Sequence, residues 1–347
     1  MRPPAFWWQP AAGPAARLLE PLSWLYGKAA AGRIRRPGTR LPLPVICVGN
    51  FVAGGAGKTP AALALGQRLI ARGERPFFLS RGYRSAAEHG APVLVDLARH
   101  QAADVGDEPM LLARLAPTIV GADRVAAGRL AMANAASLLI LDDGLQNPAL
   151  EKDLRLVLVD GETGIGNGLC LPAGPLRAPL ASQMDLASAV IIVGKGAAGA
   201  SLAMRAGAAD RPIINAEFVI PPEAAASLAG RSVFAFAGIA LPRKFYASLA
   251  AVGAVIAGVK DFPDHHMYSF REVSALQRRA RDCEATLVTT EKDFVRLSLL
   301  GPHMADPALP APVAVPVALK FTEDLLLDEI VAAARARGCS RGSCGSG

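Results

Sequence analysis

Residues 45–60 read VICVGNFVAGGAGKTP, an apolar, β-branched run that leads into a glycine-rich loop and a Lys-Thr pair. A buried strand, a loop with several glycines and a helix start, in this order, are typical of a P-loop. In a P-loop, backbone N–H groups and the helix N-terminus surround phosphates. Lys58 would then reach the β- and γ-phosphates, and the Thr59 hydroxyl would bind Mg²⁺. The stretch therefore predicts a nucleotide site, without saying which reaction takes place there.

One position of the loop departs from the usual pattern. Val52 stands where the first glycine, five residues before Gly57, is expected. Gly54 and Gly55 still keep the loop open, so we favour a nucleotide loop over a glycine-rich structural turn. The residues expected to bind the nucleotide are Val52, Ala53, Gly54, Gly55, Ala56, Gly57, Lys58 and Thr59.

From Pro44 onward, short apolar runs alternate with Ala- and Leu-rich helical patterns. Apolar strands separated by helices indicate a parallel sheet covered on both faces, hence an α/β, doubly wound, mostly parallel fold. Its ligand site should lie at the carboxyl ends of the strands. The expected strands are Val45–Val48, Phe77–Leu79, Val93–Val95, Leu138–Leu141, Leu156–Val159 and Val190–Val193, and the expected helices are Thr59–Ala71, Glu108–Leu115 and Arg124–Ala135.

A second, smaller α/β lobe is expected after Pro221-Pro222. Its predicted elements are strands Val233–Phe236 and Thr286–Val288 and helices Phe245–Ala251, Arg271–Arg281 and Asp324–Ala334, the last of which could pack back on the first domain. The expected organisation is an N-terminal interfacial helix at 1–40, a P-loop core at 41–225, the smaller lobe at 226–337 and a flexible Gly/Ser-rich tail at 338–347.

The positive charge of the chain is concentrated at its start. Residues 1–40 contain seven basic residues against one glutamate, so they carry +6 of the formal net charge of +7. The remaining residues are almost neutral, which argues against a nucleic-acid partner, because such a protein carries its basic patch on the folded body. No obligate protein partner is evident. The five cysteines are scattered and odd in number, as in a reduced cytosolic protein.

The same N-terminal segment contains all three tryptophans, Trp7, Trp8 and Trp24. Leu18, Leu22 and Leu25 follow at helical spacing, and the basic run 33–36 comes next. Aromatic and basic side chains on an amphipathic helix suit a membrane surface. The alternative is a helix packed on its own domain, with the tryptophans buried and the arginines in solvent, and the segment by itself fits either.

Two carboxylates end the apolar strand at Leu138–Leu141. Asp142 and Asp143 occupy the place of a Walker B carboxylate, so we expect one of them to bind Mg²⁺ directly or through water. A strand-end turn is the alternative, since Asp-Asp-Gly is favourable turn chemistry. Gln146 should line the same site.

The motifs, taken together and in order, resemble the tetraacyldisaccharide 4′-kinase family, the lipid A 4′-kinases of Gram-negative bacteria. The resemblance extends from the aromatic N-terminus to about residue 296. The matching stretches are Val48-Gly49-Asn50 through Thr59-Pro60, Leu79-Ser80-Arg81-Gly82-Tyr83, Gly106-Asp107-Glu108-Pro109, Asp142-Asp143-Gly144-Leu145-Gln146, Leu171-Pro172-Ala173-Gly174-Pro175-Leu176-Arg177, Phe236-Ala237-Gly238-Ile239-Ala240, Pro263-Asp264-His265 and Thr289-Thr290-Glu291-Lys292-Asp293.

This resemblance implies a kinase dependent on ATP and Mg²⁺. Its substrate would be an acylated glucosamine disaccharide 1-phosphate lipid, phosphorylated on the 4′-hydroxyl to give lipid IVA. The expected location is peripheral, on the cytoplasmic face of the bacterial inner membrane, with the N-terminal segment touching the membrane surface.

The resemblance also implies residue roles. Asp107 would be the catalytic base and His265, from the second lobe, its partner; without the family, Asp107 could simply cap a helix. Arg177 and Lys58 complete the expected catalytic set, and Arg81 is a further candidate for a phosphate contact. Glu291-Lys292-Asp293 would either fix the closed lobes or approach the base of the nucleotide.

Two positions depart from the family pattern, which usually has histidine where this chain has Asn147 and glutamate where it has Ala178. Both lie beside expected site residues, so the sequence does not say whether these two positions contact the metal or the substrate.

An alternative class is a membrane-associated P-loop ATPase switch of the partitioning or targeting type. Those proteins place a lysine just before the Gly-Gly of the loop, where this chain has Ala53. A GTPase is a third option, but no Asn-Lys-x-Asp motif appears.

Overall fold

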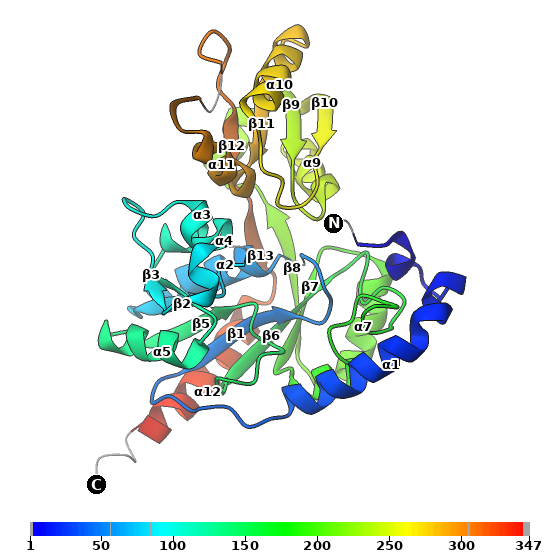
Figure 1. Cartoon of the computed structure of the whole chain (residues 1–347), viewed down its shortest axis with the longest axis vertical. Coiled ribbons are helices and arrows are strands. Elements are labelled where there is room, and N and C mark those ends of the chain that lie inside the picture. Colours follow the sequence, from blue (N-terminus) through cyan, green and yellow to red (C-terminus); the bar gives the residue numbers. More distant parts are fainter. Residues whose placement is uncertain (1–2, 56, 84, 304–305, 343–347) are drawn as a thin grey trace.

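The computed structural model describes residues 3–55, 57–83, 85–303 and 306–342. A large and a small sheet form two lobes, one above the other in Figure 1. The large sheet has the strand order β13-β8-β7-β6-β1-β5-β2-β4-β3 within the described residues, and only its edge strands β13 and β3 pair antiparallel. Its strands are β1 (Val45–Asn50), β2 (Pro76–Ser80), β3 (Val93–Leu94), β4 (Thr118–Val120), β5 (Leu138–Asp142), β6 (Leu154–Asp160), β7 (Ala189–Val193), β8 (Ile213–Val219) and β13 (Ala318–Phe321).

Helices cover both faces of this sheet, as the continuous apolar strands predicted. Strands β1, β5 and β7 are buried along their whole length, because each has helices on both sides. One face packs against α2 (Lys58–Ile70), α4 (Asp107–Ala113) and α12 (Asp324–Gly342), and the other against α5 (Arg124–Ala133), α6 (Leu180–Leu186) and α7 (Ala197–Gly207). From β1 the chain goes out to β2 and β3 and returns through β4 to β5, and it then continues on the other side of β1 through β6, β7 and β8. The doubly wound fold is thus confirmed, with its switch point at the carboxyl end of β1.

The small lobe is a parallel sheet of order β10-β9-β11-β12. One apolar cluster joins it to α8 and α9, and a second joins it to α10 and α11. Strands β10 and β12 were not predicted, because half-exposed β10 has no continuous apolar run and β12 is three residues long. The elements are α8 (Pro222–Leu228), β9 (Ser232–Ala237), α9 (Pro242–Ala251), β10 (Val255–Asp261), α10 (Phe270–Asp282), β11 (Thr286–Thr290), α11 (Glu291–Leu297), η3 (Ser298–His303) and β12 (Val313–Val315).

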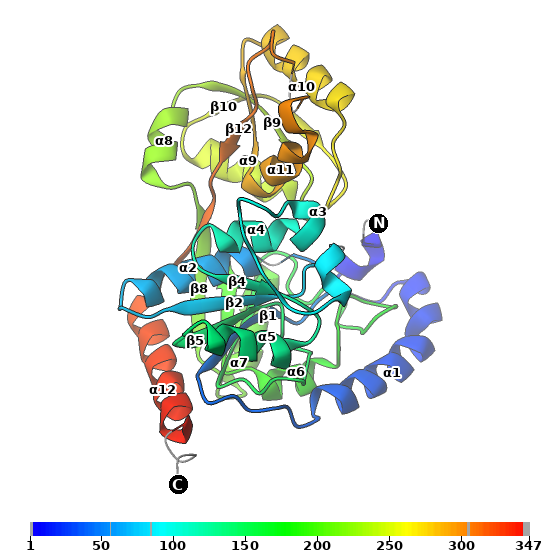
Figure 2. The same cartoon turned by 60° about the vertical axis from the view of Figure 1, so that its left-hand side comes forward.

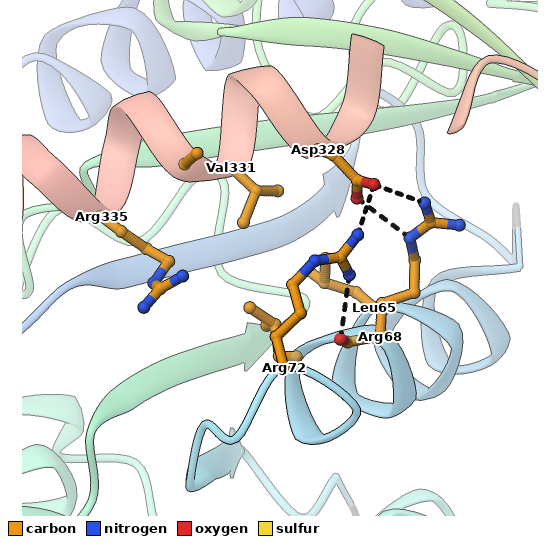
Figure 3. A pocket seen from close by; sticks show the side chains of 8 residues that line it. Leu65, Arg68, Arg72, Asp328, Val331 and Arg335 are labelled. Carbon is orange, nitrogen blue, oxygen red and sulfur yellow. Dashed lines mark hydrogen bonds and ion pairs between the residues drawn. The ribbon is translucent and has the colours of Figure 1, made fainter. Parts of the chain in front are cut away.

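The C-terminal segment returns to the large lobe, as the alternative for the last helix allowed, so the small lobe ends before the expected residue 337. Strand β13 pairs with β8, and the apolar side of α12, with Leu327 and Val331, packs on the large sheet. Figure 3 shows how Arg68 of α2 and Arg72, just after that helix, reach Asp328 of α12; Arg68 Nη2 lies 3.0 Å from Asp328 Oδ2. The pocket among these side chains has a volume of about 40 Å³, too little for a ligand. Helix α12 continues to Gly342, through the first half of the expected tail, and residues 343–347 lie outside the described part.

The N-terminal segment forms η1 (Ala5–Trp8) and α1 (Pro14–Ile34), which runs along the side of the large lobe (Figure 1). The side of α1 that meets the lobe is made mostly of small residues: Ala16, Ser23, Gly27, Ala30 and Ile34. The opposite side presents large apolar residues to solvent, Leu18 (82% exposed), Leu22 (57%) and Leu25 (58%), and Trp24 is also 58% exposed. No helix in the described residues is both long and apolar enough to span a membrane.

Candidate active site

The glycine-rich loop lies at the carboxyl end of β1, as predicted. Side chains at both ends of the loop hold its backbone: Asn50 Nδ2 and Lys58 Nζ both donate to Gly54 O, at 2.8 and 3.2 Å. Gly57 begins α2 with φ 85°, and a Cβ there would lie 2.6 Å from the Phe218 ring. Only glycine meets both demands. Ala56, also predicted to bind the nucleotide, lies outside the described residues.

A second loop braces the first half of the P-loop. We call residues 170–178, between β6 and α6, the arginine loop. Val52 pairs with Leu176 in an antiparallel bridge, and Ala53 N donates to Pro175 O at 2.7 Å. Arg177 N donates to Phe51 O at 3.0 Å. The N–H of Ala53 is therefore engaged with protein, while the loop from Gly54 onward remains the part available to phosphates.

The predicted metal-binding residues Thr59 and Asp142 are in contact. Thr59 Oγ1 donates to Asp142 Oδ2 at 2.9 Å, and Asp142 Oδ1 is buried with no hydrogen-bond partner in the part of the chain described. Burial, with a further contribution from the charge of Glu108, raises the pKa of Asp142 to about 7. A buried, unpaired carboxylate oxygen beside a hydroxyl fits Mg²⁺, which prefers oxygen ligands and is completed by water and nucleotide phosphates.

Asp143 forms ion pairs with two cationic side chains. Arg177 binds it with two parallel bonds, Nη1 to Oδ1 at 2.8 Å and Nη2 to Oδ2 at 3.0 Å. Lys58 Nζ lies 3.6 Å from Asp143 Oδ2. Burial acts to raise the pKa of Asp143, but Lys58 and Arg177 outweigh it and hold the pKa well below the usual range. Arg177 therefore pairs with a carboxylate in this structure. Lys58 and Arg177 are cationic side chains that could bind a phosphate in place of Asp143.

Two site residues adopt backbone conformations that are uncommon for residues with a side chain. Asp143 has φ 60° and His265 has φ 58°, in the left-handed region. Side-chain-bearing residues pay a conformational cost there, and such residues gather at functional sites. Neither lies inside a helix or strand, so the surrounding contacts hold them in place.

Asp107 begins α4 and is buried between the lobes. It is not the cap of its helix, because Gly106 occupies the N-cap position. Arg296 Nε and Nη2 donate to Asp107 Oδ2 at 2.9 and 2.5 Å, and His265 Nδ1 lies 3.4 Å from the same oxygen. Burial acts to raise the pKa of Asp107, but the contacts with His265 and Arg296 reverse this and hold it well below the usual range. The structure thus brings Asp107 and His265 together.

Arg296 itself is fixed by a network inside the small lobe. Its Nη1 donates to Gly238 O at 2.7 Å and to Asp293 Oδ1 at 3.0 Å. Asp293 also accepts from Tyr268 OH at 2.8 Å and from Thr290 Oγ1 at 2.6 Å. Both oxygens of the fully buried Asp293 carboxylate accept hydrogen bonds, so its contact with Arg296 is fixed. Arg296 therefore presents its guanidinium to Asp107 in one orientation.

A second ion pair joins the two lobes. Lys292 Nζ of α11 lies 2.5 Å from Glu108 Oε1 of α4, and Figure 2 shows these two helices meeting between the lobes. Burial acts to raise the pKa of Glu108, but Lys292 outweighs it and the pKa is lowered. Of the two roles considered for the segment 291–293, contact between the lobes is the one seen.

The remaining expected residues lie around this centre. Gln146 donates to Asn50 O at 2.7 Å and accepts from Arg177 Nη1 at 3.4 Å, so it lines the site. Arg81 is exposed and pairs with Glu88 of η2 (Ala86–His89) at 2.9 Å. The side chain of Asn147 accepts from Ala149 N, and Ala178 is buried against Ala30 and Ile34 of α1. Asn147 thus stabilises a local turn, and Ala178 contributes to the packing of α1.

Arg296 and Gln183 were missed by sequence reasoning. The partner of Arg296 lies 189 positions away, and α11 was not predicted as a helix. The available signal was its spacing of three from Asp293, which places both on one helix face. Short helix α3 (Ala102–Val105), which precedes the Asp107 turn, was also missed.

Fold and site together define a P-loop enzyme, in which Thr59 contacts Asp142 beside the loop and Asp107 meets His265 between the lobes. The comparisons with known proteins are specific. A model of the family described as tetraacyldisaccharide-1-P 4′-kinase matches residues 15–335, and the chain belongs to that family.

Two relatives and one solved structure show how far the similarity extends. The tetraacyldisaccharide 4′-kinase of Methylobacterium nodulans is 52% identical over 93% of both chains. That of a second Methylobacterium strain is 49% identical over 99% of this chain and 100% of its own. The crystal structure of LpxK from Aquifex aeolicus in complex with ATP has a TM-score of 0.68 at 25% identity, covering 92% of this chain and 99% of that one.

Proposed function

We propose that this chain transfers the γ-phosphoryl group of ATP to the 4′-hydroxyl of a tetraacyl glucosamine disaccharide 1-phosphate, giving lipid IVA. The observation that carries the proposal is the contact of Asp107 with His265 between the lobes, in a chain whose P-loop residue Thr59 contacts Asp142. Asp107 sits at the start of α4 and His265 comes from the small lobe, so a hydroxyl between the lobes could meet both. The names of the family and its relatives supply the chemical identity of the acceptor.

At the phosphate end, Lys58 and Arg177 would leave Asp143 and neutralise the phosphates. Both lie within 3.6 Å of Asp143 in this structure, so binding a phosphate would replace these ion pairs. Thr59 and Asp142 would hold Mg²⁺, whose charge polarises the phosphates when bound. Gln146, which accepts a hydrogen bond from Arg177 Nη1 at 3.4 Å, would help to fix the orientation of the guanidinium.

At the acceptor end, Asp107 would orient the hydroxyl and take its proton. Its lowered pKa keeps it ionised at neutral pH, although it makes Asp107 a weak base. Phosphoryl transfer through a loose transition state depends mainly on positioning, so a weak but fixed base is adequate. His265 would orient the carboxylate through its 3.4 Å contact, which requires the two lobes to be together.

We further propose that α1 places the enzyme on the inner face of the membrane. The support is the orientation of α1, since Leu18, Leu22 and Leu25 face solvent while small residues face the protein. Lys28 Nζ lies 3.8 Å from the centroid of the Trp24 ring, which is also exposed. Leucine, tryptophan and basic residues together favour an anionic lipid surface, where the acylated substrate would also lie.

The dependence of ATP consumption on the acceptor tests this function. With the full chain, Mg²⁺ and ATP, we expect little turnover on bare liposomes and rapid turnover once tetraacyl disaccharide 1-phosphate is added to them. Equal stimulation by bare liposomes would instead favour a membrane-associated ATPase switch, which has no use for the Asp107–His265 pair.

A further inference from the structure

The buried amide of Gln183 is not used by any role given above. Gln183 comes from α6 and its side chain is fully buried. Its Nε2 donates to Phe51 O at 3.2 Å and to Ala178 O at 2.6 Å, and its Oε1 accepts from Gln146 Nε2 at 2.7 Å. One side chain thus joins the start of the P-loop, the end of the arginine loop and a residue that lines the site.

These bonds continue into the centre of the site. Gln146, held by Gln183 and by Asn50 O, accepts from Arg177 Nη1 at 3.4 Å. Arg177 in turn binds Asp143 through both terminal nitrogens. The chain of contacts therefore runs from α6 through two amides to the guanidinium.

Packing alone does not explain a glutamine at this position. A buried amide brings a desolvation cost, and its bonds add only about 1 kcal/mol each to stability. Its neighbours in α6, Met184 and Leu186, pack in apolar clusters without making any such polar contact. What glutamine adds is a donor for two carbonyl groups on separate loops and an acceptor for Gln146.

We propose that Gln183 is a positioning residue for the phosphoryl transfer: it fixes the two loops relative to each other and, through Gln146, sets the orientation of Arg177. The inference rests on the proposed role of Arg177 at the phosphates. Helix α6 is itself anchored, because Leu186 packs with Ala30 and Ile34 of α1. Gln183 therefore has a rigid base from which to hold both loops.

The test compares Gln183→Leu with Gln277→Leu in the full chain. Gln277 is a matched control, since it is also buried and its amide bonds backbone groups, donating to Pro310 O at 3.0 Å, but it lies in the small lobe on α10. We expect Gln183→Leu to lower kcat roughly 10- to 100-fold, the cost of a group misplaced by about 1 Å, with the KM for ATP nearly unchanged. Gln277→Leu should lower only the Tm. Full kcat in Gln183→Leu would overturn the proposal.

A second measurement separates positioning from a general structural role. Combined with Arg177→Lys, Gln183→Leu should add little further loss, because both changes disturb the same guanidinium. Losses that multiply, with Arg177→Lys alone already slow, would refute the role of Gln183 and leave that of Arg177 intact. If Arg177→Lys is as fast as the parent, both assignments fall. Gln183→Met, of similar length, replaces the leucine variant should that variant not fold.

Discussion

Arg296 of α11 and Asp107 of α4 form a buried ion pair across the two lobes, with Arg296 Nε and Nη2 donating to one carboxylate oxygen at 2.9 and 2.5 Å. Arg296 is 3% exposed and Asp107 is 9% exposed. The contact makes the position of the proposed base depend on the small lobe. Together with the hydrogen bond to His265, it lowers the pKa of Asp107 although burial acts to raise it.

Removing Arg296 should be costly. Arg296→Met leaves Asp107 buried without its principal counter-charge, and breaking one side of a buried pair typically costs about 3–5 kcal/mol. We expect a lower Tm together with a large fall in kcat, measured by thermal denaturation and acceptor-dependent turnover. Arg281→Met is the control, since Arg281 makes only an exposed pair with Asp282, and it should behave as the parent. A Tm in Arg296→Met equal to that of the control contradicts the account.

Replacing Asp107 should affect turnover far more than nucleotide binding. Asp107→Asn keeps the shape but removes the charge that would accept the proton, so kcat should fall about 10²- to 10⁴-fold. The dissociation constant of ATP, measured by calorimetry, should change little, because no P-loop residue contacts Asp107 in the described part of the chain. Equal losses in both quantities would make Asp107 a structural residue.

The lowered pKa of Asp107 predicts a specific acid response. An aspartate in an unfolded chain titrates near about 3.9, and in the folded protein Asp107 titrates below that value. The unfolded state therefore binds protons first, and the stability from Asp107 is fully present above about pH 5 and is lost as the pH falls through 4 and below. Urea unfolding between pH 6 and 3 should show a shallower loss in Asp107→Asn than in the parent. The pKa of Asp143 is also lowered and leaves part of the slope in both proteins. Equal slopes in the two proteins contradict the assignment.

Charging the exposed side of α1 should release the enzyme from lipid. Leu18 is 82% exposed on α1 and Leu325 is 80% exposed on α12, which makes them a matched pair. In sedimentation with anionic liposomes, Leu18→Glu should bind less than the parent and Leu325→Glu should bind equally well, because only α1 would enter the interface. Unchanged binding in Leu18→Glu combined with Leu22→Glu would refute the membrane role of α1.

The sequence was sufficient for the parts of the site that are local or ordered by motif. The β1–loop–α2 unit follows from residues 45–60, and Val48 and Asp142 are neighbours in the β1–β5 register, which places Thr59 by Asp142. The exposed side of α1 could be predicted only as one of two alternatives, because periodicity gives a stripe of leucines but not the direction in which it faces.

What the sequence could not supply were the contacts between lobes and between loops. Arg177 was expected to meet phosphate, and its pairing with Asp143 depends on the fold of the arginine loop. The pairing of Arg296 with Asp107 depends on how two separate sheets dock. The position of β13 and α12 on the large lobe depends on a chain return that no local pattern marks.

The most direct test of the proposed activity is to follow the phosphoryl group itself. The purified full chain is incubated with Mg²⁺, γ-³²P-labelled ATP and tetraacyl disaccharide 1-phosphate in mixed micelles, beside the Asp107→Asn variant. The account predicts that the parent forms one labelled lipid bearing a new phosphomonoester at the 4′ position, and that the variant forms almost none. Label that appears only as inorganic phosphate, at the same rate in both proteins, would contradict it.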